Sequence, residues 1–127
     1  MAGQTPCAVL LLEDEPLILM DLEMAVEDSG CTPLPASSVV AAFDAISRAE
    51  AINVAVLDVN LGPNETCLPI AMELQRRQIP YILHSGDLDR QDEMVRDLSA
   101  ELVAKPACSS DVIARALAAA GLPNRAN

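Results

Sequence analysis

Four short apolar runs constrain the fold of this chain more than any other feature. They are Ala8–Leu12, Val54–Leu57, Tyr81–Leu83 and Leu102–Ala104, and each is bounded by polar or turn residues. Runs of this length without polar alternation are typical of strands buried on both faces, as in a parallel sheet. A weaker run, Cys31–Pro35, predicts a fifth strand.

Amphipathic segments separate the apolar runs. Apolar residues recur with helical spacing between Ile18 and Val26, between Val39 and Ile46, around Ile70 and Leu74, and between Ile113 and Ala120. The charged segment Asp87–Leu98 predicts one more helix, which packs weakly. Because each pair of parallel strands needs a crossover, this alternation predicts a doubly wound α/β fold with helices on both faces of the sheet.

Length and charge limit the classes of protein that the chain can represent. We expect one domain over 1–127, with a core at about 7–121 and a tail at 122–127. The net charge of −11 disfavours binding to nucleic acid or to an anionic membrane surface. The start MAGQTPC does not resemble a signal peptide, and no apolar stretch reaches the roughly 20 residues of a membrane span. These features predict a cytoplasmic protein.

The four cysteines are widely spaced. They form no Cys-x-x-Cys pair, and the chain has one histidine, so the sequence indicates neither a zinc site nor a redox motif. Cys7 and Cys31 begin strands that are expected to be neighbours. Because a cytoplasmic setting favours thiols, we predict no disulfide.

Polar side chains that can do chemistry stand at the ends of the predicted strands. Ligands of doubly wound sheets bind at the carboxyl ends of the strands, so we expect these side chains to converge there. The residues are Glu13, Asp14, Asp58, Ser85 and Lys105.

The three carboxylates of this group would repel one another without positive charge nearby. Mg²⁺ and the Lys105 ammonium are natural counter-charges, since Mg²⁺ binds a few carboxylates together with water. An acid, a divalent metal, a lysine and a hydroxyl suit the transfer of a phosphoryl group to a carboxylate. Asp58 is the best-placed nucleophile.

Plainer interpretations exist for the same residues. Glu13 and Asp14 would suit the start of a helix at Pro16, and such capping can coexist with metal binding. Asp58 alone would suit an ordinary turn. His84 is interpreted as a packed structural residue, because strand alternation turns it away from Ser85.

Four motifs follow one another at the strand ends: LLLEDE (10–15), VLDVNLG (56–62), ILHSG (82–86) and VAKP (103–106). Together they resemble the receiver domains of bacterial two-component response regulators, from about Ala8 to Leu117. The resemblance implies a flavodoxin-like, five-stranded parallel sheet of order 2-1-3-4-5 flanked by five helices.

The resemblance also assigns roles. Asp58 would accept a phosphoryl group from a sensor histidine kinase or a phosphotransfer protein. Asp14 would bind Mg²⁺ directly, Glu13 mainly through water, and Asp58 and the Asn60 backbone carbonyl would complete the protein ligands. Lys105 would pair with the phosphoryl oxygens. Ser85 would relay the signal to the surface of helix 4, strand 5 and helix 5, where a downstream protein would bind; a homodimer is also compatible.

The sequence departs from the common receiver pattern at a few positions. Leu102 stands where many receivers have the aromatic residue of the switch, and Ala107 where Phe often follows Lys-Pro. Pro63 and Thr66 also differ from the usual loop. The resemblance is therefore to an atypical subgroup, in which the aromatic part of the switch is in doubt.

The sequence thus predicts a stand-alone receiver in a phosphorelay, a signalling domain rather than an enzyme. Two alternatives remain open. The first is a receiver-like interaction module that works without phosphate, suggested by Leu102 and Ala107. The second is a Mg²⁺-dependent aspartyl-phosphate phosphatase, although Asn60 stands where such enzymes usually hold an acid.

Overall fold

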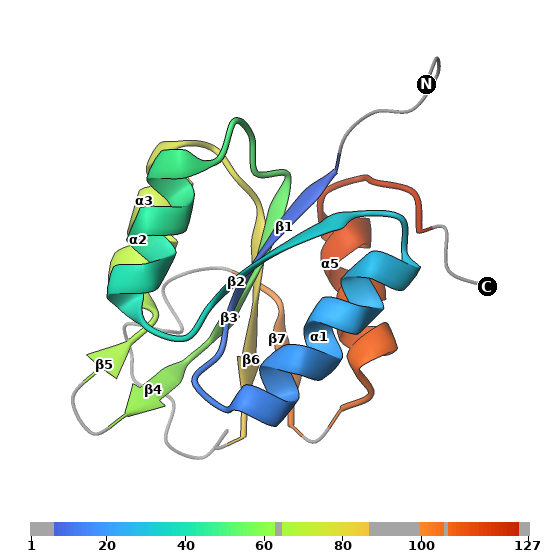
Figure 1. Cartoon of the computed structure of the whole chain (residues 1–127), viewed down its shortest axis with the longest axis horizontal. Helices are drawn as coiled ribbons and strands as arrows, with labels where there is room; N and C mark the ends of the chain where they lie inside the picture. Colours follow the sequence, from blue (N-terminus) through green and yellow to red (C-terminus); the bar gives the residue numbers. More distant parts are fainter. Residues whose placement is uncertain (1–6, 63–64, 87–99, 106, 125–127) are drawn as a thin grey trace.

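A five-stranded parallel sheet forms the centre of the computed structural model (Figure 1), which describes residues 7–62, 65–86, 100–105 and 107–124. Its strand order is β2-β1-β3-β6-β7. When only the five strands of this sheet are numbered along the chain, the order is the predicted 2-1-3-4-5. The labels β6 and β7 arise because β4 and β5 form a separate hairpin. The strands are β1 (Ala8–Leu12), β2 (Thr32–Ala36), β3 (Val54–Asp58), β6 (Tyr81–Ser85) and β7 (Leu102–Ala104).

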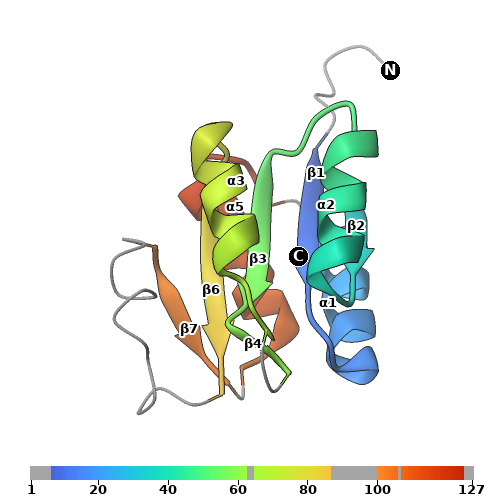
Figure 2. The ribbon, with the colours of Figure 1, turned by 90° about the vertical axis from the view of Figure 1, so that its left-hand side faces the viewer.

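Two helices cover each face of the sheet in the described residues. Figure 2 shows α2 (Val39–Arg48) and α3 (Leu68–Arg76) on the side toward the viewer, and Figure 1 shows α1 (Pro16–Asp28) and α5 (Ser109–Ala119) on the opposite side. These are four of the five predicted helices. The fifth, expected within Asp87–Leu98, lies outside the described residues.

Side chains of alternate residues in each central strand pack into two separate cores, one on each face of the sheet. In β1, Leu10 and Leu12 join the core beneath α2 and α3, while Val9 and Leu11 join the core beneath α1 and α5. All four side chains are almost fully buried. This two-sided burial explains why the strands appear in the sequence as unbroken apolar runs.

The segment after Asp58 forms a small antiparallel hairpin that the sequence did not predict. It comprises β4 (Asn60–Gly62) and β5 (Glu65–Thr66), with Asn60 paired to Thr66. Gly62 has a φ of 141°, a conformation that favours glycine over any other residue. The hairpin stands beside the carboxyl end of β3 (Figure 1), where the candidate site is expected.

The prediction of no disulfide is wrong, because Cys7 and Cys31 are disulfide-bonded. The two residues directly precede the paired positions Ala8 and Thr32 of β1 and β2, so the sheet itself brings them together. Cys67 and Cys108 are free thiols. Among the described residues, no helix combines the length and the apolar character needed to cross a membrane.

Candidate functional site

The ends of four neighbouring strands deliver the predicted site residues to one edge of the sheet. Glu13 and Asp14 follow β1, Asp58 closes β3, Ser85 closes β6 and Lys105 follows β7. Strand β3 runs one residue beyond its apolar run and β6 runs two residues beyond, so Asp58 and Ser85 belong to the ladder itself. The polar groups are therefore held on rigid elements.

Lys105 bridges two buried carboxylates. Its Nζ lies 3.0 Å from Oε1 of Glu13 and 3.4 Å from Oδ1 of Asp58. Glu13 is fully buried and Asp58 is 3 % exposed, whereas Lys105 keeps partial contact with solvent. A cation between two buried acids is the arrangement expected when desolvated charges must be balanced.

Backbone contacts fix Glu13 within this group. Its N–H donates to the Ala36 carbonyl at the end of β2, at 3.0 Å. Its Oε2 accepts from the N–H of Glu15, the residue that precedes α1, at 3.2 Å. Glu13 thus contacts the backbone just before α1 while it faces Lys105, but no side chain caps the helix itself, so the capping interpretation is not confirmed.

Glu13, Asp14 and Asp58 are arranged so that they could hold a cation. One ligand atom from each lies within 4.8 Å of the others. Oε1 of Glu13 is buried and makes no hydrogen bond among the described residues, although it faces the Lys105 ammonium. Asp14 is exposed, which leaves the group open to solvent on one side. Oxygen ligands with free coordination capacity and room for water fit Mg²⁺.

The pKa of Asp58 reflects this crowding of acids. Burial and the neighbouring charge of Glu13 raise the pKa of Asp58 to about 8, while Lys105 acts in the opposite direction. With so high a pKa, Asp58 is largely protonated near neutral pH. Additional positive charge nearby would lower this pKa and favour the ionised carboxylate. A divalent cation at the acidic group would supply it.

Ser85 is tied to Lys105 through the main chain. The N–H of Lys105 donates to the Ser85 carbonyl at 2.8 Å, which extends the pairing of β6 with β7. Ser85 is 1 % exposed. The structure thus brings the predicted hydroxyl, lysine and acid onto three adjacent strand ends.

Two further predicted positions lie close to the site. Asn60 begins β4, two residues after Asp58, and the assignment of its carbonyl as a metal ligand stays a prediction. Leu102 begins β7 and pairs with Leu83; it is partly buried and packs against the core beneath α2 and α3. The position of the common switch aromatic is therefore an ordinary packing position here.

His84 and Cys67 are neighbours of the site that were not predicted to belong to it. His84 is buried, as predicted for a structural residue, and pairs with Asp58 across β3 and β6. Neither ring nitrogen has a hydrogen-bond partner among the described residues, and burial followed by the Lys105 charge lowers the pKa of His84. Burial and the charge of Asp58 raise the pKa of the Cys67 thiol to about 12.

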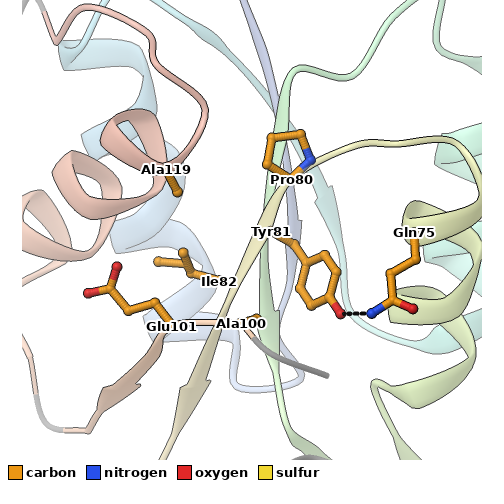
Figure 3. A pocket seen from close by; sticks show the side chains of 7 residues that line it. All are labelled: Gln75, Pro80, Tyr81, Ile82, Ala100, Glu101 and Ala119. Atoms are coloured by element: carbon orange, nitrogen blue, oxygen red, sulfur yellow. Dashed lines mark hydrogen bonds between the residues drawn. The ribbon is translucent and has the colours of Figure 1, made fainter. Parts of the chain in front are cut away.

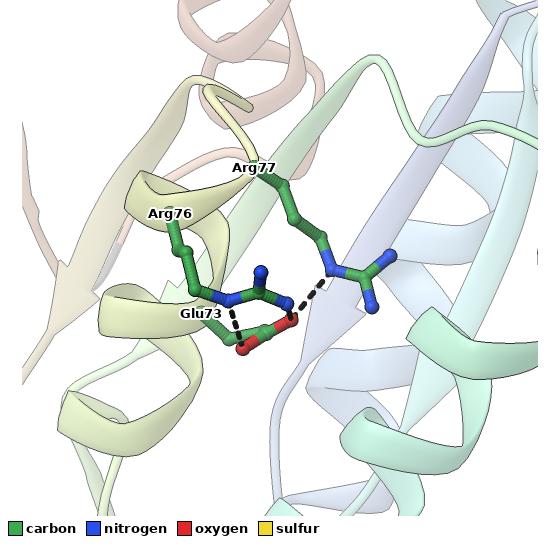
Figure 4. A network of polar contacts seen from close by, with 3 residues as sticks. All are labelled: Glu73, Arg76 and Arg77. Atoms are coloured by element: carbon green, nitrogen blue, oxygen red, sulfur yellow. Dashed lines mark hydrogen bonds and ion pairs between the residues drawn. The ribbon is translucent and has the colours of Figure 1, made fainter.

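Other polar features lie away from the strand ends that carry the site. A cavity of about 320 Å³ lies near the start of β6, where Gln75 Nε2 donates to Tyr81 Oη at 2.7 Å. Figure 3 shows the side chains that line it. On α3, Glu73 accepts hydrogen bonds from Arg76 and Arg77 (Figure 4), which lowers the pKa of Glu73 to about 2. These features do not contribute to the acidic group.

Comparison with known proteins identifies the class. No protein-family model matches the chain, and no curated protein matches it in sequence. Among solved structures, a response regulator receiver protein from Burkholderia phymatum aligns with a TM-score of 0.78 at 18 % identity, covering 94 % of this chain and 98 % of its own. The receiver domain of the Francisella response regulator 1452 aligns with a TM-score of 0.73 at 21 % identity, covering 92 % and 98 %.

A third structure is closer in sequence. SdrG from Sphingomonas melonis Fr1 is 35 % identical and aligns with a TM-score of 0.74, covering 92 % of this chain and 98 % of its own. Fold, site and comparisons agree on the flavodoxin-like receiver architecture. The chain belongs to the receiver domains of response regulators.

Proposed function

We propose that this receiver domain accepts a phosphoryl group on Asp58 from a phosphohistidine of a sensor histidine kinase or a phosphotransfer protein, in the cytoplasm. The observation that carries the proposal is the position of Asp58. It is a buried carboxylate 3.4 Å from the Lys105 ammonium, within a group of acids that fits Mg²⁺. A carboxylate held in this way has one counter-charge in Lys105 and becomes a nucleophile when a divalent cation adds the rest.

The chemistry follows from the chain's own groups. A carboxylate oxygen of Asp58 attacks the phosphorus of the donor, the new O–P bond forms, and the N–P bond breaks with its electron pair passing to the imidazole. Lys105 pairs with the phosphoryl oxygens, which carry the developing charge, and the Ser85 hydroxyl donates to one of them. When bound by Glu13, Asp14, Asp58 and the Asn60 carbonyl, Mg²⁺ supplies further positive charge.

A protein donor has an apolar surface to contact beside this site. Helix α1 begins where the acidic group ends, and it exposes Leu17, Met20 and Met24 at helical spacing along one face. Five acids and no base lie between 15 and 28. This surface favours a donor that presents apolar side chains flanked by basic ones.

The phosphorylated state would then signal through a protein partner. In the family pattern, the readout surface comprises helix 4, β7 and α5. Because Leu102 replaces the usual aromatic, the signal would depend on Ser85 and Lys105 without a rotating ring. Leu102 in place of the aromatic residue favours the second candidate, a receiver-like module that binds its partner without phosphate. The formation of a homodimer is a separate property to test.

Intact mass after incubation with Mg²⁺ and a low-molecular-weight phosphoryl donor tests the proposal. The wild type should gain one phosphoryl group, and Asp58→Asn and EDTA-treated protein should gain none. Asp44→Asn, which changes an exposed acid paired to Arg48 on α2, is the matched control and should behave as the wild type. An unmodified wild type that also fails to bind Mg²⁺ would favour the phosphate-independent module. Turnover of an added phosphomonoester would favour the phosphatase.

A further inference from the structure

The Cys7–Cys31 pair lies at the end of the sheet opposite the acidic group. Cys7 precedes β1, whereas Glu13 and Asp14 follow it, so the five residues of β1 separate Cys7 from Glu13 by about 20 Å. The Thr32 N–H donates to the Cys7 carbonyl at 2.8 Å, which holds the two cysteines opposite each other. Their Cα atoms are 4.8 Å apart, within the range that an unforced disulfide spans.

The bond closes a covalent ring around one supersecondary unit. The ring runs from Cys7 through β1, the acidic pair and the whole of α1 to Cys31. Both cysteines pack beside the core beneath α1 and α5, and both keep partial contact with solvent. A reagent in solution can therefore reach the pair, in contrast to Cys67, which is fully buried.

We propose that Cys7 and Cys31 form a reversible redox modification site, which exchanges with low-molecular-weight disulfides and staples the β1–α1–β2 unit when oxidised. The proposal rests on three features of the structure. The pairing of β1 with β2 places the two cysteines side by side, both residues are partly exposed, and the bond closes a ring. It does not depend on phosphoryl transfer.

The exchange proceeds in two balanced steps. The thiolate of one cysteine attacks a small disulfide, forming a mixed disulfide and releasing one small thiolate, which takes up a proton. The other cysteine then attacks the protein sulfur of the mixed disulfide and expels the second small thiol. The pair loses two electrons and two protons, and the small disulfide gains them.

Oxidation should change stability and leave the site chemistry alone. A ring of this length restricts the unfolded chain, so the oxidised domain should melt about 10 °C above the reduced domain. Because the acidic group lies at the far end of β1, both redox forms should gain a phosphoryl group at equal rates. Failure of the phosphorylation test would therefore leave the redox proposal standing. Failure of the redox test would likewise leave the proposed phosphorylation of Asp58 standing.

The experiment uses the full chain with Cys108→Ser, which removes the exposed free thiol and its intermolecular disulfides. Samples are equilibrated in glutathione buffers of rising disulfide-to-thiol ratio, then denatured and alkylated. Intact mass should show three alkylated cysteines in the most reducing buffer and one in the most oxidising buffer. Thermal unfolding should show a higher melting temperature for the oxidised form than for the reduced form, and added reductant should return the melting temperature to that of the reduced form.

Cys7→Ser/Cys31→Ser in the same background is the matched control. It should melt near the reduced parent and should not respond to the buffer. Should this variant fail to fold, the oxidised and reduced forms of the parent still give the comparison. Three results would overturn the proposal: three free thiols in every buffer, a pair that stays oxidised in excess thiol, or equal melting temperatures for the two forms.

Discussion

Lys105 Nζ lies nearer to Glu13 than to Asp58, at 3.0 Å from Glu13 Oε1 and 3.4 Å from Asp58 Oδ1. The lysine therefore serves first as the counter-charge of the fully buried Glu13. A phosphoryl group on Asp58 would present new anionic oxygens to the same ammonium. The position of the lysine thus links the stability of the resting site to its proposed chemistry.

Removal of the Lys105 charge should destabilise the metal-free domain. Lys105→Met keeps the aliphatic stem but leaves two buried acids without their cation, and the free energy of unfolding should fall by about 2–3 kcal/mol in EDTA. Saturating Mg²⁺ should restore part of the loss, because it binds the folded state. Urea denaturation with and without Mg²⁺ measures both effects.

Arg115→Met provides the control for that loss. Arg115 forms a surface ion pair with Glu101 at 2.9 Å, and both side chains are largely exposed. Its removal should cost less than about 1 kcal/mol and should not respond to Mg²⁺. Equal losses for the two variants would show that Lys105 does not balance a buried charge.

The stability of the metal-free domain should depend on pH through Asp58. Its pKa is raised from 3.8 to about 8, chiefly by burial and Glu13, so the fold favours the protonated acid. The stabilisation is full below about pH 4 and is lost as the pH rises through 8. Mg²⁺ should therefore stabilise the domain more at pH 8 than at pH 5, as measured by denaturation at both pH values. Asp58→Asn should lose this difference, and a wild type that responds equally at both values would contradict the assignment.

The strand ends of the site could be predicted from the sequence because an unbroken apolar run marks each strand. Asp58 directly follows such a run, Ser85 stands two residues after the end of another, and parallel pairing places both at one edge. The β4–β5 hairpin could not be predicted, since Asn60, Gly62 and Pro63 are equally typical of an open loop. Local residue preferences leave that segment undetermined, and only its pairing with Glu65 and Thr66 defines the strands.

The errors in the prediction also have physical causes. Strand β2 gave a weak signal because Pro33 and Pro35 interrupt it, yet an edge strand tolerates proline where the missing N–H would face away from its one partner. The disulfide follows from tertiary structure, because the pairing of β1 with β2 brings together two cysteines that are 24 residues apart in the sequence. Within the part of the chain that the structure describes, the ring nitrogens of His84 lack hydrogen-bond partners because of the tertiary packing, which no local sequence pattern records.

Replacement of His84 by an apolar residue should stabilise the fold. His84 is 3 % exposed, and its ring nitrogens have no hydrogen-bond partner among the described residues. Its burial therefore removes hydrogen bonds to water that no protein group replaces. His84→Leu has a similar volume and should raise the free energy of unfolding by about 1 kcal/mol. Ser29→Ala is the contrasting control, because its buried hydroxyl donates to the Ala25 carbonyl at 2.9 Å and its loss should destabilise. A less stable His84→Leu domain would indicate a hydrogen bond to His84.

The apolar face of α1 should matter for a protein donor and not for a small one. Leu17 is 73 % exposed at the start of the helix, beside the acidic group, and its apolar surface would be covered when a donor brings its phosphohistidine to Asp58. Leu17→Glu places a further acid on a surface that already lacks bases, and it should slow transfer from a phosphorylated histidine phosphotransfer protein at least about tenfold.

The same Leu17→Glu variant should react normally with a low-molecular-weight phosphoryl donor, because that donor does not contact α1. Val40→Glu on α2 is the matched control, since Val40 is 76 % exposed and lies on a helix of the opposite face of the sheet. Rapid mixing followed by intact mass gives the rate for each donor. Slower transfer from both donors would indicate damage to the site itself, and unchanged transfer from the protein donor would place the docking surface elsewhere.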